Sequence, residues 1–197
     1  MSPDQIRALV DAAAAAIVAN ADELTRLDQA IGDGDHGSNM ARGFQAIAAE
    51  RETLAALPPG DALQKAGMLL VTTVGGASGP LYGSLLMGIG KGVKAGKPPA
   101  AAFAEGVESV KKRGKSDVGA KTMLDVLVPV QEAFLAGDGA SDLRRIANEC
   151  REATKPMLAT RGRASFLGER SIGHYDPGAT SSCLLIQAVC DVLDPMP

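Results

Sequence analysis

The chain has 197 residues, enough for a domain with a substantial core, and its net charge of −3, without a basic run, argues against nucleic acid and anionic membranes as partners. Hydrophobic residues make up 46% of the chain but aromatic residues only 3%, so alanine and leucine carry the apolar content and favour close-packed helices over sheets. The apolar run at residues 12–18 is too short to cross a bilayer, and no other stretch resembles a membrane span or a targeting signal.

Apolar residues at helical spacing predict a series of helices. In chain order, these helices cover residues 3–20, 22–31, 40–54, 61–74, 81–93, 100–113, 121–135, 141–158 and 178–193. No stretch alternates polar and apolar residues as a half-buried strand would. Eight or nine helices joined by short links predict an all-α antiparallel bundle that forms a single domain over residues 1–197.

Several of these helices carry end signals of their own. Pro3 suits a first turn, and Gly32 can end the second helix in a left-handed conformation. Ser38 or Asn39 is expected to cap the third helix, and Asp61 the fourth.

The three cysteines are odd in number and lack the spacing of a metal site. Cys183 and Cys190 are seven residues apart on a predicted helix, which places them on one face but not in a disulfide. We therefore expect small core residues in a reducing compartment, and a cytoplasmic protein.

The loop after the second helix concentrates acidic residues. Asp28 lies in the last helical turn, where the helix end is already negative, and Asp33 and Asp35 follow in the loop. A bound cation would relieve this crowding, and carboxylates without cysteine suit Mg²⁺, Mn²⁺ or Ca²⁺. The alternative is a solvated polar turn that binds no ligand.

Two familiar motifs match this loop only on paper. The spacing Gly32-x-Gly34-x-x-Gly37 satisfies the dinucleotide-binding fingerprint, but a helix rather than a strand precedes it. An EF-hand that began at Asp33 would place Phe44 where that loop requires glutamate. We reject both interpretations.

Two further segments have the composition of anion-binding loops. The glycine loop, residues 75–79, precedes a helix whose N-terminus would add its positive end, although a tight helix crossing would also need these glycines. The arginine loop, residues 160–177, has no clear period and holds Arg161, Arg163 and Arg170, which suit phosphate oxygens as forked donors. Together with the acidic loop, these segments describe a Mg²⁺–polyphosphate site.

Five other residues could belong either to the site or to the structural framework. The only two histidines, His36 and His174, lie in the most irregular loops, which slightly favours a site role for both. Asp176 and Pro177 form a plain helix entry, with Asp as the cap and Pro in the first turn, and a functional role of Asp176 is compatible with that. Met123 has the chemistry to contact an adenine ring, but core packing is the stronger interpretation.

Four motifs resemble those of the nucleotide-binding L subunits of dihydroxyacetone kinase. They are Gly32-Asp33-Gly34-Asp35-His36-Gly37, Gly75-Gly76-Ala77-Ser78-Gly79-Pro80-Leu81-Tyr82-Gly83, Gly162-Arg163-Ala164-Ser165, and Gly168-Glu169-Arg170-Ser171-Ile172-Gly173-His174 with Asp176-Pro177-Gly178-Ala179-Thr180-Ser181. They occur in the same order, and the resemblance covers essentially the whole chain. It implies a barrel of eight antiparallel helices with the nucleotide at one end.

The resemblance also implies the site residues. Asp28, Asp33 and Asp35 would be catalytic and would bind two Mg²⁺ ions that bridge the phosphates of ADP or ATP. The other nucleotide contacts would come from His36, Gly37, Ser38, Asn39, Ala77, Ser78, Gly114, Met123, Arg163, Asp176, Pro177 and Gly178, with Gly114 and Met123 near the adenosine. Ala120 departs from the bacterial subunits, which often carry Asp before Lys-Thr-Met, and this puts only local detail in doubt.

By the same resemblance, the chain would be a free-standing phosphotransferase subunit that is active only with partners. ADP would stay bound as a cofactor, and a phosphohistidine carrier (M) subunit would rephosphorylate it to ATP. The phosphoryl group would then pass to dihydroxyacetone held covalently on a K subunit. Neither nucleic acid nor a membrane is expected as a partner, and a homodimer is left open.

Three alternatives share the same nucleotide site. One is the nucleotide subunit of an ATP-dependent kinase for a related ketose, such as a tetrulose, because substrate choice would lie in the partner. Another is the nucleotide domain of a fatty-acid kinase type, which would be part of a longer chain. The third is a regulator that senses ADP without catalysis.

Overall fold

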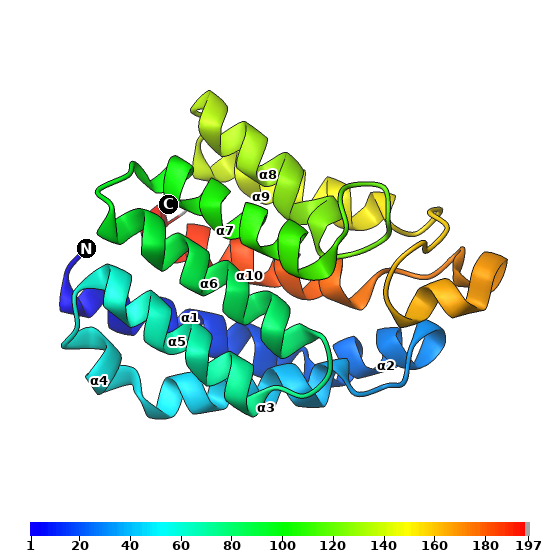
Figure 1. Ribbon diagram of the computed structural model, residues 1–197, viewed down its shortest axis with the longest axis horizontal. Helices are drawn as coiled ribbons and strands as arrows, with labels where there is room; N and C mark the ends of the chain where they lie inside the picture. The colour runs from blue at the N-terminus through cyan, green and yellow to red at the C-terminus, as the bar shows by residue number, and fades with distance from the viewer. Residues whose placement is uncertain (196–197) are drawn as a thin grey trace.

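The computed structural model describes residues 1–195, and within that range it consists of helices, turns and loops (Figure 1). The helices are α1 (Pro3–Ala19), α2 (Ala21–Ile31), α3 (His36–Ala49), α4 (Arg51–Ala55), α5 (Pro59–Thr73), α6 (Ser78–Lys94), α7 (Pro99–Gly114), α8 (Leu124–Ala136), α9 (Ala140–Ala153), the 3₁₀ helix η1 (Arg163–Ser171) and α10 (Pro177–Leu193).

Eight of these helices close into a ring. Along the order α1, α3, α5, α6, α7, α8, α9, α10, each helix packs against the next, and α10 packs against α1. Successive members of the ring run in opposite directions, while α2 and η1 lie together at one end, on the right in Figure 1. The prediction of an all-α, barrel-like antiparallel bundle of about eight helices is confirmed.

Small residues allow the helices of the ring to approach closely. Gly67 of α5 and Gly83 of α6 face each other, and a Cβ added to either would come within 2.8 Å of the other's carbonyl oxygen. The interior is otherwise aliphatic, with Leu24, Leu70 and Leu124 almost wholly buried. This close packing compensates for the scarcity of large aromatic side chains.

The cysteines behave as predicted from their spacing. All three are free, and Cys183 and Cys190 are buried on α10 within the cluster formed by α8, α9 and α10. That cluster meets the main core around Phe103 and Ile186, which pack against both. The assignment of residues 1–197 to a single domain stays a prediction.

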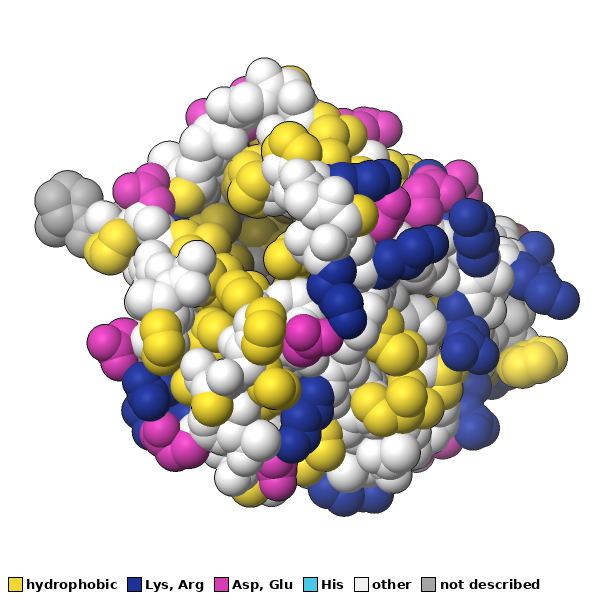
Figure 2. All heavy atoms as spheres, turned by 60° about the vertical axis from the view of Figure 1, so that its left-hand side comes forward, with side chains coloured by type: hydrophobic (Ala, Val, Ile, Leu, Met, Phe, Trp, Pro, Cys, Tyr) yellow, Lys and Arg dark blue, Asp and Glu magenta, His cyan; other side chains and the backbone are white. Residues whose placement is uncertain are grey.

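The surface carries charges of both signs. On the face in Figure 2, which includes the left-hand end of Figure 1, basic side chains are interspersed with acidic and apolar ones. Exposed ion pairs such as Lys94–Asp61, at 2.6 Å, contribute little individually because water screens them. None of the helices described has the length and apolar character needed to cross a membrane.

Several predicted helix ends were wrong by a few residues. The third helix begins at His36 with Asp35 as N-cap, and not after Ser38 or Asn39. The next long helix, α5, begins at Pro59 rather than after an Asp61 cap, since proline already suits a first turn. α9 ends at Ala153 instead of residue 158, and the predicted helix 40–54 breaks at Glu50 into α3 and α4.

Two errors have a clear conformational cause. Gly32 is extended, at φ −147°, and the left-handed residue is Gly34, at φ 75°. A side chain at position 32 would collide with the Asp28 carboxylate, so the glycine provides space rather than handedness. α8 begins at Leu124 and not at residue 121, because Lys121 is itself left-handed, at φ 61°.

Candidate functional site

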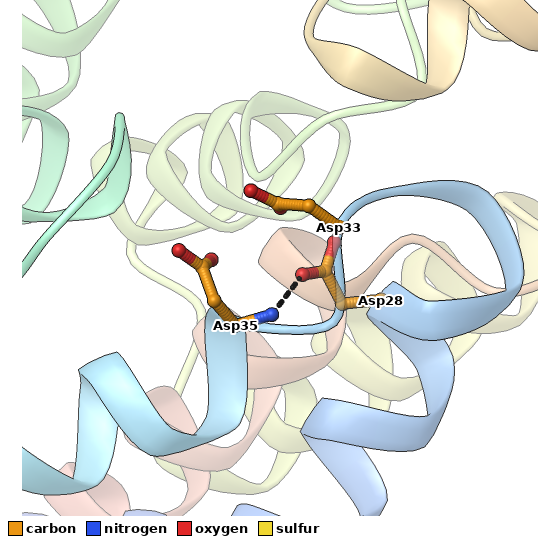
Figure 3. Close-up of side chains that lie close together, drawn as sticks. All are labelled: Asp28, Asp33 and Asp35. Carbon is orange, nitrogen blue, oxygen red and sulfur yellow. Dashed lines mark hydrogen bonds between the residues drawn. The ribbon is translucent and has the colours of Figure 1, made fainter.

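The three predicted acids meet at the end of the ring where α2 passes into α3. Asp28, Asp33 and Asp35 each offer a carboxylate oxygen within 4.8 Å of the other two, and they face a common space beside the loop (Figure 3). Asp28 is buried, whereas Asp33 and Asp35 are exposed enough to reach a ligand from solvent. Three hard oxygen donors at this separation fit Mg²⁺ or another hard divalent cation.

Asp28 is held in place by the start of α3. Its Oδ2 accepts hydrogen bonds from the backbone amides of Asp35, at 2.9 Å, and His36, at 3.1 Å. These amides are the free donors of a helix N-terminus, which favours a negative charge. The position therefore offsets the unfavourable end of α2, and it leaves the second oxygen of Asp28 available to a cation.

His36 links the acidic loop to the glycine loop and to α10. Its Nδ1 lies 3.0 Å from Ser78 Oγ, and its Nε2 lies 2.9 Å from Ser181 Oγ. Ser181 is in turn 2.7 Å from the Tyr82 hydroxyl. Burial lowers the pKa of His36, against the opposing effect of Asp28 and Asp35, so the neutral imidazole is the form that fits this network.

The arginine loop folds over the acidic cluster. Half of this loop forms η1, which consists of 3₁₀ turns with a kink at Gly168 and packs on α2. Arg163, the first residue of η1, places its guanidinium 3.1 Å from the Asp33 carboxylate. The loop thus brings a forked cationic donor to the place where the phosphates of a metal-bound ligand would lie.

Asp176 connects the site to the start of α10. As predicted, it is the N-cap: its carboxylate accepts from the Ala179 amide at 2.6 Å, and Pro177 follows in the first turn. Burial raises the pKa of Asp176 to about 7, and the nearby carboxylates of Asp125 and Asp28 act in the same direction.

One cavity of about 170 Å³ gathers most of the predicted residues. From the predicted set, its lining includes Asp28, Asp33, Asp35, His36, Ala77, Ser78, Met123, Arg163, Asp176, Pro177 and Gly178. Gly37, Ser38, Asn39 and Gly114 lie outside this lining. His174 is exposed and also lies outside this lining, so the structure does not place the second histidine in the cavity.

The structure gives some of these residues other contacts. Gly37 packs against α2, where a side chain would collide with the Ala21 carbonyl and with Thr25. The Ser38 hydroxyl donates to the carbonyl of Asp35 at 3.0 Å, and the Asn39 side chain accepts from Arg42. Gly37 can therefore offer a ligand only backbone groups, and the Asn39 amide oxygen is already bound by Arg42.

Sequence reasoning missed Lys121 and Tyr82 as members of the lining. Tyr82 lies within the glycine-loop motif, and one of only two tyrosines in a chain without tryptophan was a signal that could have pointed to it. Lys121 gave no such signal, because it falls inside a stretch with helical spacing.

The fold and the site together describe an all-α domain, a closed ring of helices that carries an acidic cluster, a glycine loop and an arginine loop at one end. The profile of the DAK2 domain family matches residues 30–191 of this chain. The chain therefore belongs to the DAK2 domain family, which confirms the resemblance seen in the motifs.

Curated relatives within this family are named as kinase subunits. The chain is 46% identical over 170 residues to the ADP-binding subunit DhaL of PEP-dependent dihydroxyacetone kinase 1 from Listeria innocua, with 84% of each chain covered. It is 41% identical over 180 residues to the corresponding DhaL subunit of Escherichia coli K12, with 83% of this chain and 84% of the relative covered.

A solved structure shares the fold. The dihydroxyacetone kinase from C. freundii in complex with AMP-PNP and Mg²⁺ superposes with a TM-score of 0.79 at 25% identity, over 94% of this chain. This chain spans only about a third, 33%, of that kinase chain.

Proposed function

We propose that the chain is the phosphoryl-transfer subunit of a dihydroxyacetone kinase and holds ADP or ATP with two Mg²⁺ ions at the end of the ring where α2 and η1 lie. The observation that carries this proposal is the convergence of Asp28, Asp33 and Asp35 on one cavity that Ser78 and Arg163 also line. The names of the DhaL relatives and the AMP-PNP and Mg²⁺ of the C. freundii complex support it.

The acidic residues and the hydrogen-bond donors of the site would bind different parts of the ligand. The three aspartates would hold the metal ions, while Ser78, the glycine-loop amides and Arg163 would orient phosphate oxygens. When bound, Mg²⁺ would neutralise phosphate charge that the acidic loop would otherwise repel. Catalysis in this arrangement is mostly positioning and electrostatic stabilisation, for which no protein nucleophile is needed.

A second hollow extends the site toward the predicted adenosine end. It has a volume of about 470 Å³, is lined by residues 115–120 among others, and shares Arg161 with the first cavity. Gly114 directly precedes this stretch, and Met123 lines the first cavity. A nucleotide with its phosphates at the acidic cluster could therefore direct its base toward this hollow.

The finer mechanism concerns the partners. We infer that a phosphohistidine carrier (M) subunit rephosphorylates ADP on this chain, and that the phosphoryl group passes to dihydroxyacetone on a K subunit. The relatives named as PEP-dependent, and the Lactococcus lactis relative named as PTS-dependent at 40% identity, favour this donor. A cytoplasmic location and a homodimer stay predictions.

The decisive experiment is to purify the protein in Mg²⁺ buffer, denature it and identify any released nucleotide by chromatography. Near-stoichiometric ADP is the expected result. The purified chain should then restore dihydroxyacetone phosphorylation when it is mixed with K and carrier subunits and phosphoenolpyruvate. A chain that binds Mg·ADP but transfers nothing in this mixture would be a regulator, and the proposed activity would be wrong.

A second candidate is the nucleotide component of an ATP-dependent ketose kinase. The chain is 34% identical to the L-erythrulose 1-kinase of Mycolicibacterium smegmatis, but it spans only 32% of that relative. Protein that is purified empty yet binds Mg·ATP reversibly, and that works with ATP rather than with the carrier, would favour this candidate.

A further inference from the structure

Lys121 is a buried lysine with no role in the proposed chemistry so far. Its side chain is 1% exposed, and its ammonium donates to two backbone carbonyls, Ser171 at 2.5 Å and Met157 at 3.1 Å. No carboxylate lies within ion-pair distance of it among the described residues. The Asp176 carboxylate is near enough to favour the charge, but the hydrogen bonds of the ammonium go to main-chain carbonyls. Such an arrangement is uncommon, because taking an ammonium out of water is costly.

The two carbonyls lie at opposite ends of one segment. Residues 157–171 leave the end of α9, pass over the acidic cluster and finish with η1, so Lys121 ties both ends together. Two further hydrogen bonds lie beside those of Lys121 and hold the same ends of the segment. The Thr160 amide donates to the Ala120 carbonyl at 3.2 Å, and the Ala159 amide donates to Ser171 Oγ at 3.0 Å. We call Lys121 with these two carbonyls the lysine clasp.

The clasp is maintained against two unfavourable terms. Burial lowers the pKa of the Lys121 ammonium, which reports the cost of keeping it charged there. The residue also has a left-handed backbone, at φ 61°, which is strained for any residue other than glycine. Asp125 supports this backbone, since its carboxylate accepts from the Gly119 and Thr122 amides at 2.6 Å each.

What the clasp holds in place is the part of the loop that faces the site. Arg163 lies within the clasped segment and reaches the Asp33 carboxylate at 3.1 Å, although its own side chain is 66% exposed. An exposed side chain is not fixed by its own packing, so its position depends on the backbone that carries it. That backbone is anchored where Lys121 binds it.

We propose that Lys121 is a positioning residue: by joining Met157 and Ser171 it holds the arginine loop, and Arg163 in particular, over the acidic cluster for binding of the nucleotide phosphates. This inference rests on the proposed function for the identity of the ligand. Whether the lysine clasp holds the loop in place can be tested without a ligand.

The first test measures the loop alone. Lys121→Met removes the ammonium while keeping a long apolar stem. Cleavage of the loop is measured with an arginine-specific protease, which cuts after Arg161, Arg163 or Arg170. Because this protease does not cut after lysine, the substitution removes no cleavage site. We expect cleavage in the loop to accelerate by at least about tenfold, as the loss of charge-assisted hydrogen bonds should populate the open loop. Lys112→Met, the same change on the exposed face of α7, should leave the cleavage rate unchanged.

The second test asks whether Lys121 acts through Arg163. Calorimetry of Mg·ADP binding is compared for Lys121→Met, Arg163→Ala and the double variant. Lys121→Met should weaken binding on the order of tenfold. The double variant should then have about the same affinity for Mg·ADP as whichever single variant binds it less tightly. The reason is that both changes remove the same interaction, the contact of Arg163 with the phosphates. Losses that multiply would show independent effects and would overturn the proposal.

The outcomes separate the two proposals. A wild-type chain without Mg·ADP affinity would refute the proposed function, while the cleavage test would still decide whether the clasp holds the loop. Unchanged cleavage in Lys121→Met would refute the clasp whatever the nucleotide result. If Lys121→Met does not fold, as judged by its melting transition, Lys121→Gln, which retains a shorter neutral donor, is measured in the same way.

Discussion

At the scale of single residues, Asp28 performs two tasks. It accepts the first amides of α3, and it contributes an oxygen to the acidic cluster. Asp35 is the N-cap of α3, but its side chain makes no capping hydrogen bond. The ion pair between Arg163 and Asp33 is too exposed to contribute much to stability. Effects on ligand binding and on folding should therefore separate most cleanly at Asp33.

We accordingly expect Asp33→Asn to abolish Mg·ADP binding without unfolding the protein. Loss of a group that only orients a metal ligand commonly costs 10–100-fold in affinity, so loss of the ligand itself should cost at least about 100-fold. Calorimetry measures the affinity and thermal melting without nucleotide measures the fold. Asp138→Asn, in the exposed turn before α9, is the matched control. Undiminished binding by Asp33→Asn would contradict the assignment.

Asp176 should make stability depend on pH. Its pKa in the folded protein, about 7, is above its ordinary value of 3.8, so between these values the folded state binds more protons than the unfolded state. The resulting stabilisation is fully present below about pH 4 and is lost as the pH rises through about 7. The free energy of unfolding of the wild type minus that of Asp176→Asn should therefore decrease from pH 5 to pH 8. Urea denaturation in EDTA measures it, and a constant difference would be inconsistent with the raised pKa.

The acidic cluster was predictable because its three carboxylates lie within eight residues of one another, where they repel each other unless a cation is bound. Lys121 was not predictable in the same way. Its burial depends on carbonyls 36 and 50 residues further along the chain, and its left-handed backbone depends on Asp125. A pattern of apolar spacing contains neither kind of information.

At the scale of elements, helical periodicity located the helices of the ring because each buries one apolar stripe. It failed at helix ends that distant groups determine. α3 starts early because Asp28, in the preceding helix, caps it, and η1 has no 3.6-residue period to detect. The glycine at position 37 illustrates the ambiguity, since a motif glycine can serve a ligand or a helix contact.

We expect Gly37→Ala to destabilise the protein because α2 and α3 touch at this point. The added methyl would come within 2.7 Å of the Thr25 amide nitrogen and closer still to the Ala21 carbonyl. Overpacking of this kind costs about 1–3 kcal/mol, which for a chain of this size lowers Tm by roughly 2–10 °C. Gly139→Ala, at φ −81° with open space around it, is the control for thermal melting. An unchanged Tm for Gly37→Ala would show that the contact relaxes freely.

At the scale of the whole molecule, ring closure assembles the site. The acidic loop, the glycine loop and the start of α10 are far apart in the sequence, and packing of α10 on α1 and of α3 on α5 brings them to one end. The sequence predicted the separate loops and, from their complementary chemistry, that they form one Mg²⁺–polyphosphate site. The family resemblance added that this site lies at one end of a helical barrel. Local patterns could not have located it there, because the ring is closed by contacts between α1 and α10, at the two ends of the chain.

Because its residues come from distant parts of the ring, a ligand bound there should stabilise the whole fold. A ligand that binds only the folded state at about 100 times its Kd adds roughly 2.7 kcal/mol, or about 5–10 °C in Tm for a domain of this size. Thermal melting with Mg·ADP, and again after EDTA treatment and nucleotide removal, measures this difference. Asp33→Asn should melt at the same temperature under both conditions, which separates binding at the acidic cluster from general effects of Mg²⁺. A wild-type Tm that does not respond to Mg·ADP, or an Asp33→Asn Tm that responds as strongly, would place the nucleotide elsewhere or show that none binds.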